Sequence, residues 1–292
     1  MNNSKKKSSY SYKKKNNDYR NSDKKQEKSK IYISKNMNYA FQVEYQIRAI
    51  KEEKIDNIEL INILKKDNVT KWGNNHLNDI NASTILKFMT RYPGVLIGTG
   101  YPHQTDANVS GEIQVGFCFD YVTGAPYYPG SSLKGILRNV FDSAINENGE
   151  LYLEYINQIV NEKDENASTI TRENIKEFVE DAFGNGERST DKAYGGTDIF
   201  YGGFVVNAQN AILGIDYLAP HKEDTTKNPI VITMLRIMPD VSISFAIDVR
   251  GNAVFDKDMR NHLYKRIIED FGIGAKRNVG YGNLKFVSQQ CK

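Results

Sequence analysis

A block of strand-like segments between two amphipathic helices is the feature that most constrains the fold of this 292-residue chain. Four segments are rich in β-branched and aromatic residues and are predicted to be strands: 199–206, 212–218, 230–238 and 241–247. Apolar residues recur at helical spacing before this block, from Ser131 to Ala144, and after it, from about Asp258 to Phe271. The block and its flanking helices therefore predict an α+β fold.

Two further strands complete the predicted pattern. Residues Ile113 to Phe119 alternate between apolar and polar side chains, and a closing strand is expected around Leu284 to Val287. With insertions set aside, the order is strand, helix, strand, strand, helix, strand. This order predicts a ferredoxin-like or RRM-type antiparallel sheet with helices on one face.

The chain is predicted to have three parts: a disordered basic arm over 1–35, a helical N-terminal segment over 36–91, and a main domain over 92–292. Apolar residues recur at helical spacing throughout the helical N-terminal segment, and the last set comprises Ile85, Phe88 and Met89. Two more helical patterns around an acidic linker predict a helical insertion at about 147–184.

The N-terminal arm has a charge distribution unlike the rest of the chain. Residues 1–30 hold eleven Lys or Arg against three Asp or Glu, a net charge of +8, whereas the whole chain has +3 and the remainder therefore −5. Repeats of Ser, Asn and Lys cannot bury enough apolar surface to offset the entropy cost of ordering, so the arm is expected to be disordered. It is either a nonspecific RNA-binding arm or a solubilising leader.

Composition excludes several classes of protein. Apolar runs fall short of the roughly 20 residues that a membrane helix requires, and no N-terminal segment resembles a signal peptide, so a cytoplasmic protein without membrane contact is expected. Cys118 and Cys291 form no C-x-x-C pair, and the four histidines have no zinc-ligand spacing. No disulfide, metal or other cofactor is predicted.

The segment 272–282 is a candidate anion-binding loop. It reads Gly-Ile-Gly-Ala-Lys-Arg-Asn-Val-Gly-Tyr-Gly and follows a helical pattern. Glycines such as Gly274 allow positive φ and can turn N–H donors toward one point, while Lys276 and Arg277 would neutralise an anion beside Asn278. Such loops also occur as plain connections between a helix and a strand, and both interpretations are open.

A second candidate lies at the start of the helix that follows Pro129. Ser131 is predicted to cap this helix, and Ser132 follows it. Lys134 and Arg138 are then separated by four residues in the first two turns, where like charges repel and the helix dipole disfavours cations. A bound anion would relieve both effects. The alternative is a solvated basic face in which Arg138 pairs with Asp142.

Three motifs together resemble those of a known family. They are Gly-x-Pro-Tyr-x-Pro-Gly-Ser-Ser-Leu-Lys-Gly at 124–135, Ala-Phe-Gly at 182–184 and the glycine-rich segment at 272–282. In this order and spacing they resemble the RAMP superfamily of CRISPR proteins, and within it the family of sixth RAMP subunits of type III-B (Cmr) effector complexes. The resemblance spans roughly residues 85–289.

The resemblance implies a non-catalytic backbone subunit that binds CRISPR RNA near its 3′ end and stacks on other RAMP subunits. Target RNA and a small helical subunit are the other implied partners. Phosphate contacts position a strand without reading its sequence, so fixed donors and a few cations suit this role. By motif match, the residues expected to face the CRISPR RNA are Ser131, Ser132, Lys134, Arg138, Gly274, Lys276, Arg277 and Asn278.

Other segments are weaker candidates. Segment 220–229 is expected to be a hairpin tip that separates guide and target strands, or an ordinary surface loop. Segment 98–106 occupies the position at which a related subunit carries a catalytic carboxylate, but Tyr101 and Pro102 depart from that subunit's pattern. The alternative function is thus an endoribonuclease that uses Asp106 or His103, with Lys134 or Lys276 stabilising charge on the scissile phosphate.

Aromatic side chains in glycine- or proline-rich loops are candidates for base stacking. Most are expected to pack in the protein instead, with at most one or two contacting a base. The candidates are Tyr101, Tyr127, Tyr128, Tyr194 and Tyr281.

Overall fold

The computed structural model describes residues 32–105, 109–185, 195–219, 231–250 and 254–291. Ile31–Lys292 form one compact unit, to which the description is confined. Most of the predicted basic arm, the hairpin tip at 220–229, and Asp106 and Tyr194 lie outside the described residues.

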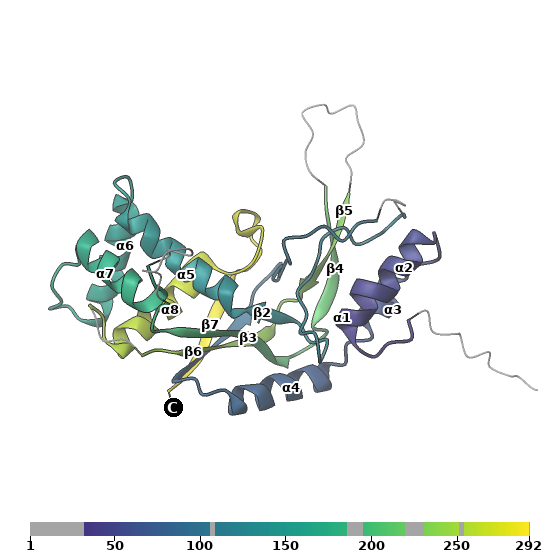
Figure 1. The fold of residues 1–292 in the computed structure, drawn as a ribbon, viewed down its shortest axis with the longest axis horizontal. Coiled ribbons are helices and arrows are strands. Elements are labelled where there is room, and N and C mark those ends of the chain that lie inside the picture. Colours follow the sequence, from purple (N-terminus) through teal and green to yellow (C-terminus); the bar gives the residue numbers. More distant parts are fainter. Residues whose placement is uncertain (1–31, 106–108, 186–194, 220–230, 251–253, 292) are drawn as a thin grey trace, which may run out of the picture. The chain divides into compact units, whose positions relative to one another are not determined.

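A five-stranded antiparallel sheet organises the fold (Figure 1). Its strand order is β2 (Tyr127–Pro129), β3 (Ile199–Ala208), β6 (Val241–Asp248), β1 (Thr84–Thr90) and β7 (Leu284–Cys291). With the short edge strand β2 set aside, the remaining four follow the chain order strand, helix, strand, strand, helix, strand. The predicted ferredoxin-like fold is therefore confirmed, and β1 lies between β6 and β7 at its centre.

The two helices of this motif, α5 (Gly130–Ile145) and α8 (Lys257–Phe271), cover one face of the sheet. Side chains from this face, such as Phe88 and Phe245, join the main apolar core with Leu137 and Ile267 of the two helices. The helical insertion consists of α6 (Glu150–Lys163) and α7 (Arg172–Phe183), which pack against α5 and α8.

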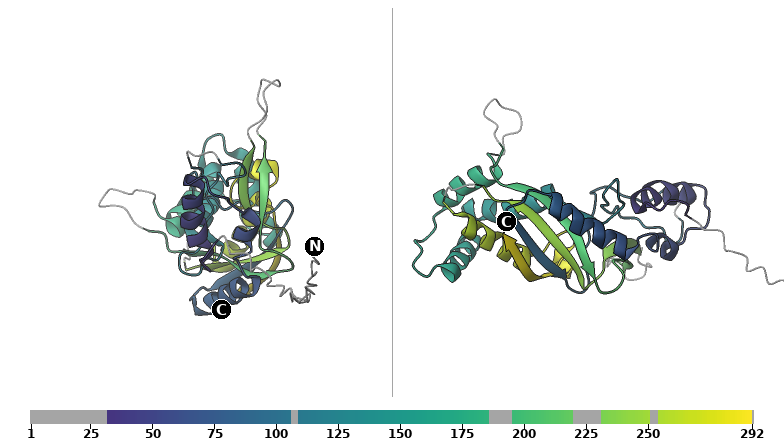
Figure 2. Two further views of the ribbon diagram at one scale, coloured as in Figure 1. Left: turned by 90° about the vertical axis from the view of Figure 1, so that its right-hand side faces the viewer. Right: turned by 90° about the horizontal axis from the view of Figure 1, so that it is seen from below.

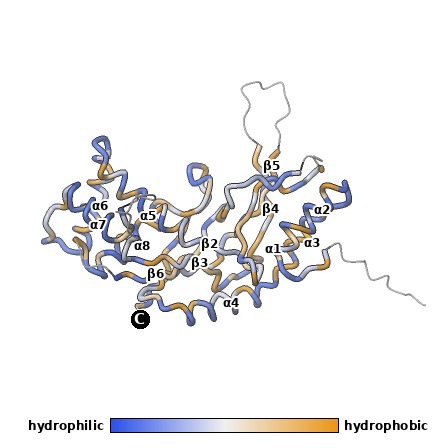
Figure 3. The backbone as a smooth tube through the Cα atoms, viewed as in Figure 1, coloured by the Kyte–Doolittle hydropathy of each residue, from blue (hydrophilic) through white to orange (hydrophobic). Residues whose placement is uncertain are grey.

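The other face of the sheet is covered by α4 (Lys66–Asp79), which lies across the strands (Figure 2). Leu77 of α4 packs with Ile85, Phe204 and Ala246 in a second apolar cluster. Hydrophobic residues run along β3 and β6, whereas α4 alternates between hydrophobic and hydrophilic residues (Figure 3). The N-terminal helical segment thus adds a third layer to the motif.

The remaining elements lie at one end of the sheet (Figure 1). The first three helices, α1 (Met37–Tyr39), the π-helix η1 (Ala40–Glu44) and α2 (Tyr45–Ile50), follow one another without a break, and α3 (Asn57–Ile61) comes next. Strands β4 (Leu213–Leu218) and β5 (Ile232–Ile237) form a separate two-stranded sheet.

Two predictions of secondary structure were wrong. Thr84–Thr90 is strand β1 and not the last helix of the N-terminal segment, so the sheet begins before the predicted boundary at residue 92. Residues Ile113 to Phe119 form isolated bridges, Ile113 to Thr233 and Phe119 to Pro126, and no strand of the main sheet. The physical reason is that β1 is covered on both faces, so its apolar residues lose the period-two alternation that marks a half-exposed strand.

A buried ion network ties the insertion to the motif. The guanidinium of Arg260 in α8 is fully buried, and its Nη1 donates to Oδ1 of Asp198 at 3.0 Å. It also pairs with Asp181 of α7, and the Tyr264 hydroxyl donates to Oδ2 of Asp198 at 2.7 Å. Burial raises the pKa of Tyr264 well above its ordinary value. This network joins α7, α8 and the segment that enters β3.

Removing Arg260 should destabilise the protein strongly. Because Asp198 would remain buried without its cation, Arg260→Ala should lower the free energy of unfolding by about 3–5 kcal/mol in urea denaturation. The control is Arg172→Ala, whose partner Glu150 is 63% exposed, and it should cost about 1 kcal/mol or less. Equal effects of the two substitutions would contradict a stabilising role for the buried network.

Candidate functional site

The glycine-rich loop between α8 and β7 is held against the backbone of residues 94–96. A Cβ added at Gly274 would lie 2.2 Å from the carbonyl oxygen of Leu96, and one added at Gly282 would lie 1.8 Å from that of Ile273. Both residues have positive φ, 77° and 79°, as does Lys276 at 57°. Glycine is needed here because other side chains would collide with backbone atoms.

The N–H groups of this loop are mostly used inside the protein. Ile273 donates to the Gly282 carbonyl at 3.0 Å, Ala275 to Leu96 at 3.0 Å and Gly282 to Gly94 at 2.8 Å. The prediction that these glycines turn several free donors toward one anion was therefore wrong. What the loop presents to solvent is its tip, the exposed Lys276, Arg277 and Asn278 around the 3-10 turn η2 (Arg277–Val279).

The start of α5 also differs from the prediction. Pro129 and not Ser131 is the N-cap residue, and no side chain caps the helix. Strand β2 runs directly into α5 at Gly130, whose added Cβ would lie 1.8 Å from the Phe200 carbonyl oxygen. This close approach sets where the helix begins, so Ser131 and Ser132 fall within its exposed first turn. The positive end of the helix dipole is therefore exposed to solvent at these two residues, whereas Gly130 is buried and its N–H faces the Tyr127 hydroxyl.

The two predicted segments meet in space. The N–H of Gly274 donates to the hydroxyl oxygen of Tyr128, in the strand before α5, at 3.3 Å. A cavity of about 640 Å³ lies between them, lined by Ser132 and Ile136 of α5 and by Gly274 and Ala275 of the loop. Figure 1 shows this loop, in yellow, beside α5. We call this cavity the α5–loop cleft.

A third segment completes the α5–loop cleft. Its wall is formed by the segment from Ile97 to Pro102 and by Gln114 and Val115. Segment 98–106 was a weaker candidate on the family resemblance and Tyr101 was a candidate for base stacking, but neither was predicted to share a site with the two anion-binding candidates. The glycines at 98 and 100 were a visible signal of an irregular loop, but nothing in the sequence indicated which loop it faces.

Two of the predicted residues, Arg138 and Lys134, lie outside the cleft, and Arg138 has other partners. Nε of Arg138 lies 3.0 Å from Oδ2 of Asp142, and its Nη1 donates to the Gly184 carbonyl at 3.3 Å. Arg138 therefore pairs with Asp142, as the alternative interpretation of Lys134 and Arg138 predicted. Partial burial, followed by the charge of Arg138, lowers the pKa of Lys134. Of the eight predicted residues, Ser132 and Gly274 line the α5–loop cleft, whereas the other six do not: Ser131, Lys134, Arg138, Lys276, Arg277 and Asn278.

His103 is buried and has structural contacts with other parts of the protein. It is 4% exposed, stacks on Phe41 with ring centroids 3.7 Å apart, and its Nε2 lies 2.8 Å from the Phe41 carbonyl oxygen. Nδ1 lies 3.1 Å from the Ile113 carbonyl oxygen. Burial lowers the pKa of the imidazole, against the opposing effect of the two carbonyl oxygens. His103 therefore joins the N-terminal helices to the loop that contains it.

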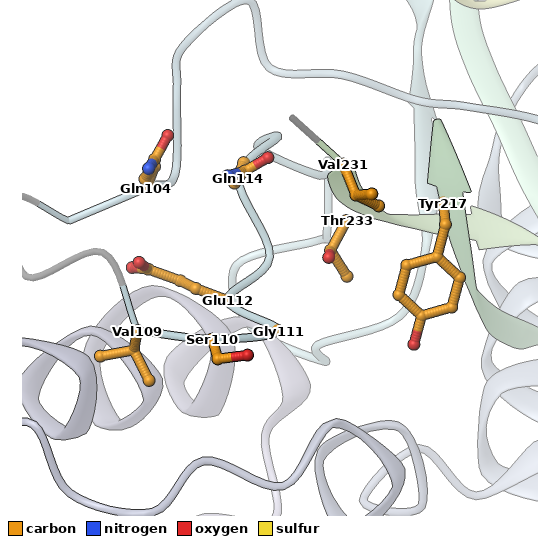
Figure 4. Close-up of a pocket in the computed structure, with 9 residues that line it drawn as sticks. All are labelled: Gln104, Val109, Ser110, Gly111, Glu112, Gln114, Tyr217, Val231 and Thr233. Atoms are coloured by element: carbon orange, nitrogen blue, oxygen red, sulfur yellow. The ribbon is translucent and has the colours of Figure 1, made fainter. Parts of the chain in front are cut away.

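A second cavity, of about 380 Å³, lies beside this region (Figure 4). Three parts of the chain line it. They are Gln104, then Val109, Ser110, Gly111, Glu112 and Gln114, and finally Tyr217, Val231 and Thr233 in or beside the two-stranded sheet. None of the described residues lining it is a lysine, arginine or histidine, and the carboxylate of Glu112 in its lining would repel an RNA phosphate.

The described part of the chain offers no metal site and no membrane-spanning helix. Among the residues with described positions, no three His, Cys, Asp or Glu side chains lie where they could hold a metal ion together. Within the same ranges, no helix has both the length and the apolar character needed to cross a bilayer.

The geometry describes an α+β protein with a ferredoxin-like sheet and an apolar cleft next to exposed cations. The sequence matches the family model of the RAMP superfamily over residues 87–285, more than half of the chain. The protein therefore belongs to the RAMP superfamily.

Two solved structures are similar to this chain at 21% sequence identity each. A chain of the "Type III-B Cmr-beta bound to cognate target RNA" aligns with a TM-score of 0.48 over 78% of this chain and 67% of its own length. Cmr6 from Pyrococcus furiosus aligns with a TM-score of 0.43 over 72% of this chain and 100% of its own. No curated protein matches the sequence.

The packing of Gly274 can be tested with a matched glycine. Gly274→Ala should lower the free energy of unfolding by several kcal/mol, because the added methyl group meets the Leu96 carbonyl oxygen. Gly280 also has positive φ, 95°, but its nearest neighbour would be 3.7 Å away, so Gly280→Ala should cost only about 1–2 kcal/mol of backbone strain. Urea unfolding measures both, and similar losses would show that close packing at Gly274 is unimportant.

Proposed function

We propose that the protein is a non-catalytic backbone subunit of a type III-B CRISPR effector complex and binds the CRISPR RNA near its 3′ end. Membership of the RAMP superfamily supports the class of protein. The assignment to type III-B complexes is supported by the combination of the Pro-Gly-Ser-Ser-Leu-Lys-Gly motif at 129–135 with the glycine-rich loop.

The observation that carries this proposal is the meeting of two anion-attracting elements at the α5–loop cleft. The open first turn of α5 reaches the cleft through Ser132, and the exposed Lys276 and Arg277 directly follow Ala275 on its other side. A helix N-terminus attracts phosphate through its free N–H groups and dipole, and the cations add charge. Such contacts hold an RNA backbone without regard to sequence.

The sheet has no open face to bind RNA, which supports binding of RNA at the loops around the α5–loop cleft. RRM-type sheets bind RNA on their open face, where aromatic side chains stack on bases. Here that face is packed under α4: an added Cβ at Gly73 would lie 2.1 Å from the Val205 carbonyl oxygen, and Trp72 meets Phe204 edge-on at 5.7 Å. RNA binding by this protein would thus use the helix start and the glycine-rich loop.

Neighbouring RAMP subunits and a small helical subunit are the proposed protein partners, and target RNA is the proposed second nucleic acid. Exposed apolar side chains in the N-terminal helical segment and just before it support protein contacts. Ile33 is 86% exposed and Ile50 is 66% exposed, and Ile47 lies one turn before Ile50 on the same helix. Scattered apolar side chains are normal on a surface, but these three are close in sequence.

Charge reversal at the loop tip tests RNA binding. Lys276→Glu with Arg277→Glu should weaken binding of single-stranded guide RNA by about tenfold for each cation lost. The slope of log affinity against log salt should fall by about 0.7 for each phosphate contact removed. The charge-matched control is Lys51→Glu with Lys54→Glu, two exposed lysines of the N-terminal segment. Equal weakening by both pairs would mean that only net charge matters.

The second candidate function, an endoribonuclease, is tested by cleavage. The buried position of His103 argues against acid–base catalysis by this residue, because RNA would have to displace Phe41 to reach it. We therefore expect purified protein, alone and within its complex, to leave guide-complementary RNA intact. Cleavage that Asp106→Ala abolishes would establish the endoribonuclease instead.

A further inference from the structure

The walls of the α5–loop cleft are apolar, although charged groups flank it. Ile97, Val115 and Ile136 line it, and the ring of Tyr101 stands at its rim with 78% of the residue exposed. Its volume of about 640 Å³ falls within the range of cavities that bind small organic groups. Apolar walls suit a flat uncharged group better than a phosphate, which would lose its hydration without gaining hydrogen bonds.

The cleft also contains a buried hydrogen-bond donor. Tyr128 lines it, is 2% exposed, and accepts the N–H of Gly274 on its hydroxyl oxygen. No residue with a described position accepts the hydroxyl hydrogen. Burial raises the pKa of Tyr128 to about 12, so the hydroxyl keeps this hydrogen at neutral pH. An occupant with a hydrogen-bond acceptor would satisfy it.

The positive charges near the cleft favour an occupant that carries a negative group. None of the described residues that line it is acidic. Ser132, in the exposed first turn of α5, lines the cleft, and Lys276 and Arg277 follow Ala275 of the lining. A flat group with acceptor atoms, attached to an anion, is the chemistry of a nucleotide: the base fits the apolar walls and the phosphate fits the cations.

We infer that the α5–loop cleft binds one unpaired nucleobase of the RNA strand whose phosphates contact Lys276 and Arg277. The base stacks on the ring of Tyr101 and accepts the hydroxyl hydrogen of Tyr128 with a ring nitrogen or carbonyl oxygen. A paired base cannot enter, because its edge is joined to its partner and its faces to its neighbours. This inference rests on the proposed function and adds a base-binding site to the phosphate contacts.

Two oligomers of equal charge separate base binding from phosphate binding. One is a fluorescently labelled single-stranded oligoadenylate of about 12 nucleotides, and the other is an oligomer of the same length with tetrahydrofuran abasic units. The full chain should bind the oligoadenylate about 5- to 150-fold more tightly, which is the affinity that stacking of one base on an aromatic ring confers. Fluorescence anisotropy across a salt series measures both affinities.

Three variants locate the base. Tyr101→Ala removes the exposed stacking ring, and Ile136→Trp fills the cleft from α5; both should bring the two affinities close together and leave binding of the abasic oligomer unchanged. Tyr121→Ala is the matched control, since Tyr121 is also exposed, at 83%, and does not line the cleft. It should keep the full preference for oligoadenylate. Thermal unfolding of each variant checks that it is folded.

The outcomes distinguish failure of this inference from failure of the proposed function. If both oligomers bind equally to the wild-type protein and charge reversal at the loop tip weakens both, RNA binding stands and the base site is overturned. A preference that persists in Tyr101→Ala and Ile136→Trp also overturns it, because the base is then bound elsewhere. If neither oligomer binds and charge reversal has no effect, the proposed function fails, and an apolar side chain of a protein partner becomes the expected occupant.

Discussion

Close contact between backbone segments at glycines is the constraint on which the candidate site depends. Gly130 lies against the Phe200 carbonyl group, and Gly274 lies against that of Leu96, at distances that leave no room for a Cβ atom. The first contact fixes where α5 begins, and the second fixes the glycine-rich loop beside it. Without both, the open helix end and the loop tip would not share one cleft, so the glycines act through packing rather than through free N–H groups.

The sheet and its covering helices give the fold its stability, whereas the candidate binding residues lie in exposed loops. The sheet is covered on one face by α5 and α8 and on the other by α4, and the buried Arg260 network joins the insertion to this framework. The loops at the start of α5 and before β7 stay exposed on this rigid support. A framework packed on both faces leaves the loops as the surface available to a ligand, which agrees with the general tendency of binding residues to lie on loops.

Much of the architecture was predictable from local pattern. The strands at 199–206 and 241–247, the helices of the motif and the helical insertion were predicted at nearly their observed bounds, because the strands are rich in β-branched and aromatic residues and the helices have a clear period. Strand β1 was mistaken for a helix because it is covered on both faces and its apolar residues Ile85, Phe88 and Met89 happen to recur at helical spacing. Pairing of Arg138 with Asp142 was among the open alternatives, whereas the cap at Ser131 was wrong because a sequence does not reveal that β2 runs straight into α5.

The sequence by itself determined most of the element types, the ferredoxin-like order and the position of two basic segments next to glycine- and serine-containing turns, since all of these follow from the periodicity and residue chemistry of adjacent positions. Only the tertiary structure decided which side chains share the cleft. It brought Ser132 and Gly274 together with two of the five candidate tyrosines, Tyr101 and Tyr128, and left Lys134 and Arg138 outside. The physical reason is that a cleft forms where segments distant in sequence approach each other, and those approaches depend on packing across the sheet.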